Sequence, residues 1–365
     1  MSVRARVVVL PKNPGPLEVQ ELRLPDPGAH QVVVKQFASG VCHSQLHQMH
    51  APRETPVILG HESTGVVLAR GREVKHVREG DKVFVTWVPR DKPHSPRFAE
   101  PAMLALAGGS VAVSQNVYTW ADHTVADEQY VVKVRPDAPT DVTAIIGCAV
   151  MTGAGAVLNT AAVKRGESVA IFGAGGVGLS AVAAAREVGA DPVIVVDLDD
   201  AKLEFARRFG ATITLNASRV DAVAEIHRLT PRAGELTMFG TPVSGVDHAF
   251  DCIGVTKTMQ QILAACRTAN FGWKGGGNAV LVGVPTSDLT MPPIDLLLHE
   301  KRFIGSIGGS CQPDRDFPIF LDWHTSRKLD LDALVTERFP IEKINEATHA
   351  LETGRIFGRA ILEFA

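Results

Sequence analysis

The stretch that decides the fold lies at residues 168–178, which read SVAIFGAGGVG, and a helical pattern follows at residues 179–188. A short apolar strand thus leads into a glycine-rich turn at the start of a helix. The turn matches the pattern G-x-G-x-x-G through Gly173, Gly175 and Gly178. In this setting the pattern is typical of a turn that holds a dinucleotide pyrophosphate at a helix N-terminus. The alternative is a glycine-rich turn without a ligand.

A second apolar run and the acid that ends it favour dinucleotide binding. Residues 192–196 read PVIVV, and Asp197 follows them directly. A carboxylate at this point can accept hydrogen bonds from the adenosine ribose and would repel a 2′-phosphate, which favours NAD over NADP. Asp197 could instead cap the helix expected at residues 201–209. Lys202 and Arg207 are cations that could bind a 2′-phosphate, so the sequence does not exclude NADP as the cofactor.

Apolar runs alternate with helical patterns through residues 150–308. Continuous hydrophobicity marks strands that are covered on both faces, and the alternation predicts a doubly wound parallel sheet. The expected strands lie at residues 168–172, 192–196, 248–252 and 279–284, and the expected helices at 179–188 and 201–209.

The first 149 residues have a different pattern, in which short β-type runs are broken by Gly and Pro. These runs lie at residues 6–10, 31–37, 64–69, 82–86 and 130–134. We expect a β-rich domain over residues 1–149 and an α/β domain over 150–308. A length of 365 residues is enough for two such domains, each with its own core.

Composition limits the possible partners. The chain is 45% hydrophobic and 21% charged, with a formal net charge of -3, so the basic surface of a nucleic-acid binder is not expected. No stretch approaches the roughly 18 apolar residues of a membrane span. The start, MSVRARVVVL, resembles a first strand rather than a secretory leader. The five scattered cysteines fit a reducing compartment, so we expect a cytoplasmic protein with a small-molecule partner.

Thiol and imidazole groups in the first domain are candidate metal ligands. They are Cys42, His43, His47, His61 and Cys148. Two Cys and one His, with a fourth position left open, make a catalytic zinc set in some enzymes. Their wide spacing does not establish a site, because a scattered Cys is more often a small buried apolar residue.

Four segments add a resemblance to these observations. They read GVCHSQLH at 40–47, PVILGHE at 56–62, GDKV at 80–83 and GCAVMTG at 147–153. In order and setting, the chain resembles the zinc-dependent medium-chain alcohol dehydrogenases over nearly its whole length. The resemblance implies a GroES-like catalytic domain at residues 1–149, a Rossmann domain at 150–308 and a return to the first domain at 309–365. It also implies hydride transfer between NAD(H) and an alcohol, aldehyde or ketone, in a homodimer or homotetramer.

The resemblance also implies a role for each matching residue. The expected ligands of a catalytic zinc are Cys42, His61 and Cys148, with Glu62 beside them as an outer or transient ligand. The expected proton relay is Ser44 and His47. The expected cofactor-binding residues are His43, Gly173, Gly175, Gly176, Val177, Gly178, Asp197, Lys202 and Arg359. Trp87 and Trp120 are expected to line a substrate pocket for a medium-sized apolar or aromatic alcohol. Either tryptophan could instead be ordinary core.

Three departures from the family pattern are visible. Residues 90–130 contain no Cys, so a second, structural zinc held by cysteines is not expected. Gln45 stands where many members carry an Asp that orients the zinc-bound His, so zinc affinity is expected to be weakened or tuned. The run GWKGGG at 272–277 resembles an added loop.

Two other functions remain open. Metal-free relatives with the same fold reduce enones or quinones and generally lack the Cys and His ligands found here, and some zinc-bearing relatives also reduce conjugated double bonds. A dinucleotide-binding protein without catalysis is a further alternative, because a fold does not fix a function.

Overall fold

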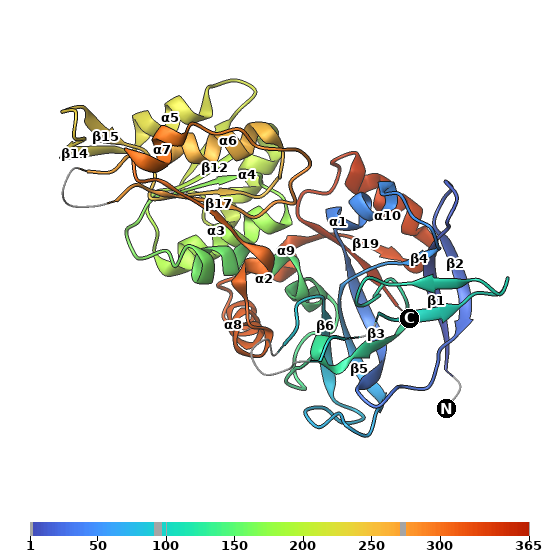
Figure 1. Ribbon diagram of the computed structural model, residues 1–365. Helices are drawn as coiled ribbons and strands as arrows, with labels where there is room; N and C mark the ends of the chain where they lie inside the picture. Colours follow the sequence, from blue (N-terminus) through green and yellow to red (C-terminus); the bar gives the residue numbers. More distant parts are fainter. Residues whose placement is uncertain (1–2, 91–96, 100, 271–274, 365) are drawn as a thin grey trace. The chain divides into compact units, whose positions relative to one another are not determined.

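The computed structural model describes residues 3–90, 97–99, 101–270 and 275–364 (Figure 1). The chain divides into two compact units. Unit 1 comprises Met1–Ala149, Gln312–Ser326 and Asp330–Ala365, and unit 2 comprises Val150–Cys311 and Arg327–Leu329. The return to the first unit therefore begins at residue 312, three residues after the expected position.

Unit 1 is rich in strands, as the broken β-type runs predicted. Its strands are β1 (Arg4–Leu10), β2 (Glu18–Arg23), β3 (Gln31–Val41), β4 (Val57–Ile58), β5 (Glu62–Arg70), β6 (Lys82–Thr86), β7 (Met103–Ala105), β8 (Val111–Val113), β9 (His123–Asp127), β10 (Val131–Lys133), β19 (Val335–Pro340) and β20 (Arg359–Glu363). Its helices are α1 (His43–His50), α8 (Pro313–Thr325), α9 (Leu331–Leu334) and α10 (Ile344–Glu352), with a 3-10 helix η2 at Val142–Gly147.

Two sheets organise unit 1. One has the strand order β2-β1-β4-β8-β7, and the other has the order β10-β6-β5-β3-β20-β19, with β9 also paired to β3. Strand β3 runs antiparallel to both β5 and β20. In this register Val41 is opposite Ala360, and Ser39 is opposite Ser63. The C-terminal end of β3 and the N-terminal ends of β5 and β20 therefore lie side by side at the same end of these strands.

Unit 2 contains the expected doubly wound parallel sheet. Its strands are β11 (Val169–Phe172), β12 (Val193–Asp197), β13 (Ile213–Asn216), β16 (His248–Asp251), β17 (Asn278–Leu281) and β18 (Arg302–Gly305), in the spatial order β13-β12-β11-β16-β17-β18. Every neighbouring pair in that order is parallel. The helices are α2 (Ala149–Gly155), α3 (Gly176–Val188), α4 (Asp200–Phe209), α5 (Ala222–Leu229), α6 (Thr256–Ala265) and α7 (Pro293–Leu297). A hairpin of β14 (Pro231–Leu236) and β15 (Pro242–Ser244) follows α5.

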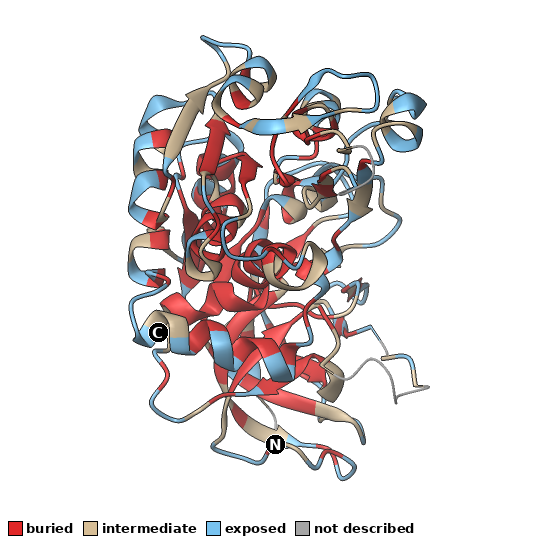
Figure 2. Cartoon of the chain, turned by 90° about the vertical axis from the view of Figure 1, so that its left-hand side faces the viewer, coloured by how far each residue is buried: buried red, intermediate tan, exposed pale blue. Residues whose placement is uncertain are grey.

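Burial explains why the strands of unit 2 lack alternation. All four residues of β11 are buried, and so are the first four residues of β12. Figure 2 shows buried strands in red and helices that carry pale blue, exposed faces. The helix expected from residue 179 begins earlier, at Gly176, because the glycine-rich turn itself forms its first turn. Residues 272–274 of the expected added loop lie outside the described residues.

Among the described residues, no helix combines the length and the apolar run that crossing a bilayer requires.

Candidate active site

Four buried or half-buried side chains of unit 1 converge. Cys42 follows the end of β3, His61 precedes β5, Glu62 begins β5, and Cys148 follows η2. Their potential ligand atoms all lie within 4.8 Å of one another, and no other such group of three or more occurs among the described residues. The Sγ atoms of Cys42 and Cys148 are 3.9 Å apart. The fold thus brings together residues that are up to 106 positions apart in the sequence.

The chemistry of this group fits zinc. Two thiols and one imidazole are the ligands of a catalytic zinc that keeps a fourth position open. The Nε2 atom of His61 is buried and has no hydrogen-bond partner in the protein. A buried polar atom without a partner is destabilising, and a metal ion at this point would satisfy it. Cys42, His61 and Cys148 are therefore suited to hold the ion.

Glu62 is linked to the arginine of a distant strand. The Arg359 guanidinium donates a hydrogen bond to Glu62 Oε1, and the backbone N–H of Ala149 lies 3.4 Å from Glu62 Oε2. Burial raises the pKa of Glu62 to about 7. A charged Cys42 also raises this pKa, whereas Arg359 lowers it. The ion pair with Arg359 thus favours the charged carboxylate, against the effect of burial.

The two thiols differ in acidity. The hydrogen bond from Cys148, aided by Arg359 and His61, lowers the pKa of Cys42 despite its burial. The same hydrogen bond and burial raise the pKa of Cys148. The Cys42 thiol is therefore the more acidic of the two.

Arg359 was expected to bind the cofactor. Within unit 1 it lies against the cluster of Cys42, His61, Glu62 and Cys148, which we call the metal group. Its side chain is buried, with 4% of the residue exposed, and it forms an ion pair with Glu62. Proximity to Glu62 and to both thiols raises its pKa, so the guanidinium stays charged. The sequence did not indicate this contact, because 297 positions separate the two residues. A role at the pyrophosphate stays a prediction.

Helix α1 carries the expected proton relay. Ser44 is half-buried, and its hydroxyl donates to Cys42 Sγ at 3.4 Å. His47 lies one turn further along α1 and is exposed, as is His43 at the start of the helix. Residues three apart on a helix share a face. Ser44 and His47 therefore lie on the same side of α1, and their role as a relay stays a prediction.

Gln45 contacts the imidazole of the metal group. Its side-chain nitrogen lies 2.5 Å from His61 Nδ1, and its Oε1 accepts a hydrogen bond from the Cys42 backbone N–H at 3.2 Å. The amide contacts the His61 ring without adding a charge, but an imidazole that binds a metal through Nε2 carries its proton on Nδ1 and needs an acceptor there, such as the Gln45 oxygen rather than its nitrogen.

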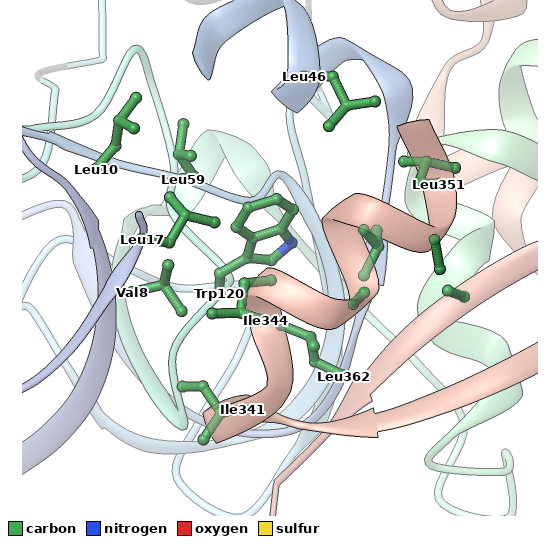
Figure 3. Close-up of a cluster of buried hydrophobic side chains, with 14 of the residues drawn as sticks. Val8, Leu10, Leu17, Leu46, Leu59, Trp120, Ile341, Ile344, Leu351 and Leu362 are labelled. Carbon is green, nitrogen blue, oxygen red and sulfur yellow. The ribbon is translucent and has the colours of Figure 1, made fainter. Parts of the chain in front are cut away.

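The two tryptophans have different environments. The Trp87 ring is half-buried, and its centroid lies 6.3 Å from that of His61. Trp120 has no exposed surface, and its indole N–H donates to the Gly40 carbonyl at 3.0 Å. Figure 3 shows Trp120 packed in the hydrophobic core, where its labelled neighbours include Leu17, Leu59 and Ile344. The expected pocket role of Trp120 is therefore corrected, because the whole side chain is enclosed by core.

The glycine-rich turn of unit 2 has the geometry that its sequence requires. Gly173 has φ +100°, a conformation that favours glycine, and a Cβ on Gly178 would lie 1.8 Å from the Gly173 carbonyl oxygen. Helix α3 begins at Gly176 and continues with Val177, so backbone N–H groups point out of its N-terminus. This end of α3 is suited to hold a pyrophosphate.

Asp197 ends β12 next to this turn. One carboxylate oxygen accepts from the Ala174 N–H at 2.7 Å, and the other accepts from Leu198 and Asp199. The alternative role, capping of α4, belongs to Asp199, which accepts from the Ala201 N–H at 2.8 Å. Lys202 is half-buried in the first turns of α4. Asp197 is thus positioned at the carboxyl edge of the sheet, where dinucleotides bind.

Comparisons with known proteins agree with this geometry. Residues 28–136 match the family described as "Alcohol dehydrogenase GroES-like domain", and residues 176–326 match "Zinc-binding dehydrogenase". The chain is 32% identical to the alcohol dehydrogenase class-3 of Cereibacter sphaeroides, over 96% of this chain and 98% of that protein. These matches define a zinc-binding dehydrogenase with a GroES-like domain and a Rossmann domain.

Solved structures share the fold over the full length. An alcohol dehydrogenase zinc-binding domain protein from Burkholderia ambifaria superposes with a TM-score of 0.88 at 29% identity, covering 100% of both chains. Benzyl alcohol dehydrogenase from Acinetobacter calcoaceticus superposes with a TM-score of 0.85 at 27% identity, again over 100% of both chains. The chain belongs to the zinc-dependent alcohol dehydrogenases of the medium-chain dehydrogenase family.

Proposed function

We propose that this chain is an NAD-dependent alcohol dehydrogenase that interconverts a primary or secondary alcohol with its aldehyde or ketone. The buried group of Cys42, His61 and Cys148, with the unpartnered His61 Nε2, carries this proposal. Zinc, when bound there, supplies Lewis acidity towards the substrate oxygen, and NAD accepts the hydride.

The residues around the metal group have separate roles in this proposal. The Ser44 hydroxyl accepts the proton released by the alcohol as it gives up its own, and the exposed imidazole of His47 is suited to pass a proton on to water. Glu62 and Arg359 neutralise one another and limit the charge beside the thiolates. Trp87, beside His61, provides an apolar wall for the substrate.

We propose a medium-sized apolar or aromatic alcohol as the substrate. The support is the indole of Trp87 near the metal group, together with the full-length similarity to a benzyl alcohol dehydrogenase. A substrate panel checks this: kcat/KM is expected to be higher for benzyl alcohol than for ethanol. A preference for ethanol or polyols would contradict it.

The metal content is the first test of the function. We expect about one zinc per chain, because the lobe at residues 90–130 has no Cys to hold a second ion. NAD-dependent oxidation of benzyl alcohol should disappear on chelation and return when zinc is added. Two zinc ions per chain would refute the single-site proposal. Absence of zinc together with enone reduction would favour a metal-free reductase, and NADH binding without turnover of any alcohol would favour a non-catalytic protein.

Cofactor choice gives a second test. Replacing Asp197 with Ser (Asp197→Ser) should weaken NADH binding on the order of 10- to 100-fold, because charged hydrogen bonds to the ribose are lost. Fluorescence titration with NADH measures this. Asp221→Ser is the matched control, since Asp221 caps α5 through Val223 and Ala224 and a serine retains a cap. An unchanged NADH affinity in Asp197→Ser would remove Asp197 from the ribose site.

We also propose that the protein works in the cytoplasm as a homodimer or homotetramer. The support for a reducing compartment is the odd number and wide scatter of the five cysteines in the sequence. The proposed assembly rests on the family, and the mass of the purified protein in solution tests it.

A further inference from the structure

A cation lies one strand away from the carboxylate expected to bind the ribose. Strands β12 and β13 are parallel neighbours, and Asp197 is opposite Asn216 in their register. The Ala217 N–H also donates to the Asp197 carbonyl oxygen at 2.9 Å. Arg219 follows three residues after Asn216. Its backbone therefore belongs to the edge of the sheet at which Asp197 lies.

Arg219 is held by the acid that begins helix α4. Its guanidinium forms an ion pair with Asp200 Oδ2, and the Asn216 side-chain amide donates to Asp200 Oδ1 at 2.7 Å. Asn216 in turn accepts from the Ser218 N–H at 2.9 Å. The loop after β13 is thus built around the Asp200 carboxylate.

The Asp200–Arg219 pair is accessible to a ligand. The side chains of Arg219 and Asp200 are 69% and 53% exposed. An exposed ion pair contributes little to stability, so this contact is not needed to hold the fold together. The ion pair instead neutralises the positive charge of Arg219, which could otherwise attract an anionic ligand next to Asp197.

The distinction between NAD and NADP is a single phosphate on the adenosine ribose. That group carries about -1.5 to -2 charges at neutral pH and is bound by an arginine or a similar cation. Here three carboxylates, those of Asp197, Asp199 and Asp200, follow one another closely after β12. A 2′-phosphate would meet these charges and an arginine that is already paired.

On the basis of the proposed NAD function, we propose that Asp200 is a second determinant of cofactor selectivity. Asp197 repels the 2′-phosphate, and Asp200 occupies the Arg219 guanidinium that would otherwise bind it. Selectivity against a close analogue is commonly achieved in this way, by an unfavourable charge or an occupied partner. The site therefore contains a latent NADP-binding cation.

The test is a series of variants titrated with NADPH and NADH by cofactor fluorescence. Asp197→Ser is compared with the double variant Asp197→Ser/Asp200→Asn, in which the amide oxygen introduced by the second substitution can still accept from Asn216. The double variant is expected to bind NADPH on the order of tenfold more tightly than Asp197→Ser, because Arg219 is released for a charge-assisted hydrogen bond. Adding Arg219→Gln should remove that gain. The gain should also fall as salt is raised from about 0.05 M to about 0.5 M, since exposed charges are screened.

A second ion pair on the same helix provides the matched control. Glu204 and Arg207 lie on α4, with Glu204 Oε2 3.2 Å from Arg207 Nε. Glu204→Gln in the Asp197→Ser background removes the same charge but releases a different arginine. We expect no gain in NADPH affinity from it. An equal gain would show that net charge, or Arg207 rather than Arg219, is responsible and would overturn the proposal.

Two further outcomes separate this inference from the proposed function. If the triple variant keeps the NADPH gain, Arg219 does not meet the phosphate and the inference is wrong. The inference also fails alone if the unchanged enzyme binds NADH and the double variant shows no gain. If the unchanged enzyme binds neither dinucleotide, the proposed function itself fails.

Discussion

Cys148→Ala should lose most of its bound zinc, and its kcat/KM for alcohol oxidation should fall on the order of a thousandfold. Cys148 contributes one of two thiols within a group whose ligand atoms lie within 4.8 Å of one another. Loss of a ligand removes several kcal/mol of charge stabilisation at the substrate oxygen, and each 1.36 kcal/mol is a factor of about ten in rate. Metal analysis and steady-state kinetics on the same preparation measure both effects.

Cys266→Ala is the matched control for this loss. Cys266 is also fully buried, but it lies in unit 2 and its thiol bonds to the Ile262 carbonyl at 3.2 Å. Its removal should cost stability without changing zinc content. His61→Ala should reproduce the zinc loss, which guards against a folding defect specific to Cys148→Ala. Full zinc content in both Cys148→Ala and His61→Ala would contradict the assignment of the ligands.

Asp247→Asn should destabilise unit 2 by about 3–5 kcal/mol, which is the usual effect of breaking a buried ion pair from one side. The Asp247 carboxylate accepts from the Arg267 Nε at 2.8 Å, from the Arg232 guanidinium, and from the Ser168 N–H at 3.0 Å. Arg267 is buried, so its charge would be left without compensation. Urea unfolding at pH 7 measures the difference in the free energy of unfolding.

The pH dependence of this effect has a defined sign. Burial would raise the pKa of Asp247, but Ser168, Arg267 and Arg232 outweigh it and hold the pKa well below its usual range. A carboxyl group with a depressed pKa in the folded state adds stability above its unfolded pKa of about 4, and this stability is lost as the pH falls further. The gap between wild type and Asp247→Asn should therefore be constant from pH 7 to 5 and shrink below about pH 4.

Glu225→Gln is the control, because it removes a charge that contributes little to stability. Glu225 pairs with Arg228 on the exposed side of α5. Removing such an exposed pair should leave the free energy of unfolding almost unchanged. A similar loss in both variants would mean that the burial of Asp247 is not the cause.

The sequence predicted the parts of the fold that depend on local pattern. Strands β11 and β12 were recognised because continuous burial leaves a continuous apolar run. Strand β13 was missed because it has four residues, all half-buried, and no such run. Strand β18 was missed for a similar reason, since it is short and lies at the edge of the sheet.

The site was less accessible to sequence reasoning. Resemblance indicated Cys42, His61 and Cys148, whereas their spacing alone gave no reason to bring them together. Hydrophobicity could not distinguish Trp120, which lies in the core, from Trp87, which lies near His61. The contact of Arg359 with Glu62 depends on the antiparallel pairing of β20 with β3, which no local pattern encodes.

The order in which the chain is synthesised bears on how the metal group forms. Unit 2 is almost entirely one continuous segment, Val150–Cys311, so it can fold while translation is still in progress. Unit 1 is interrupted by that segment, and β20, which pairs with β3 and carries Arg359, is its last strand. A nascent chain would therefore display a finished nucleotide-binding fold before its thiols gain their buried countercharge. Arg359, which pairs with Glu62, is therefore the last residue of this cluster to be synthesised.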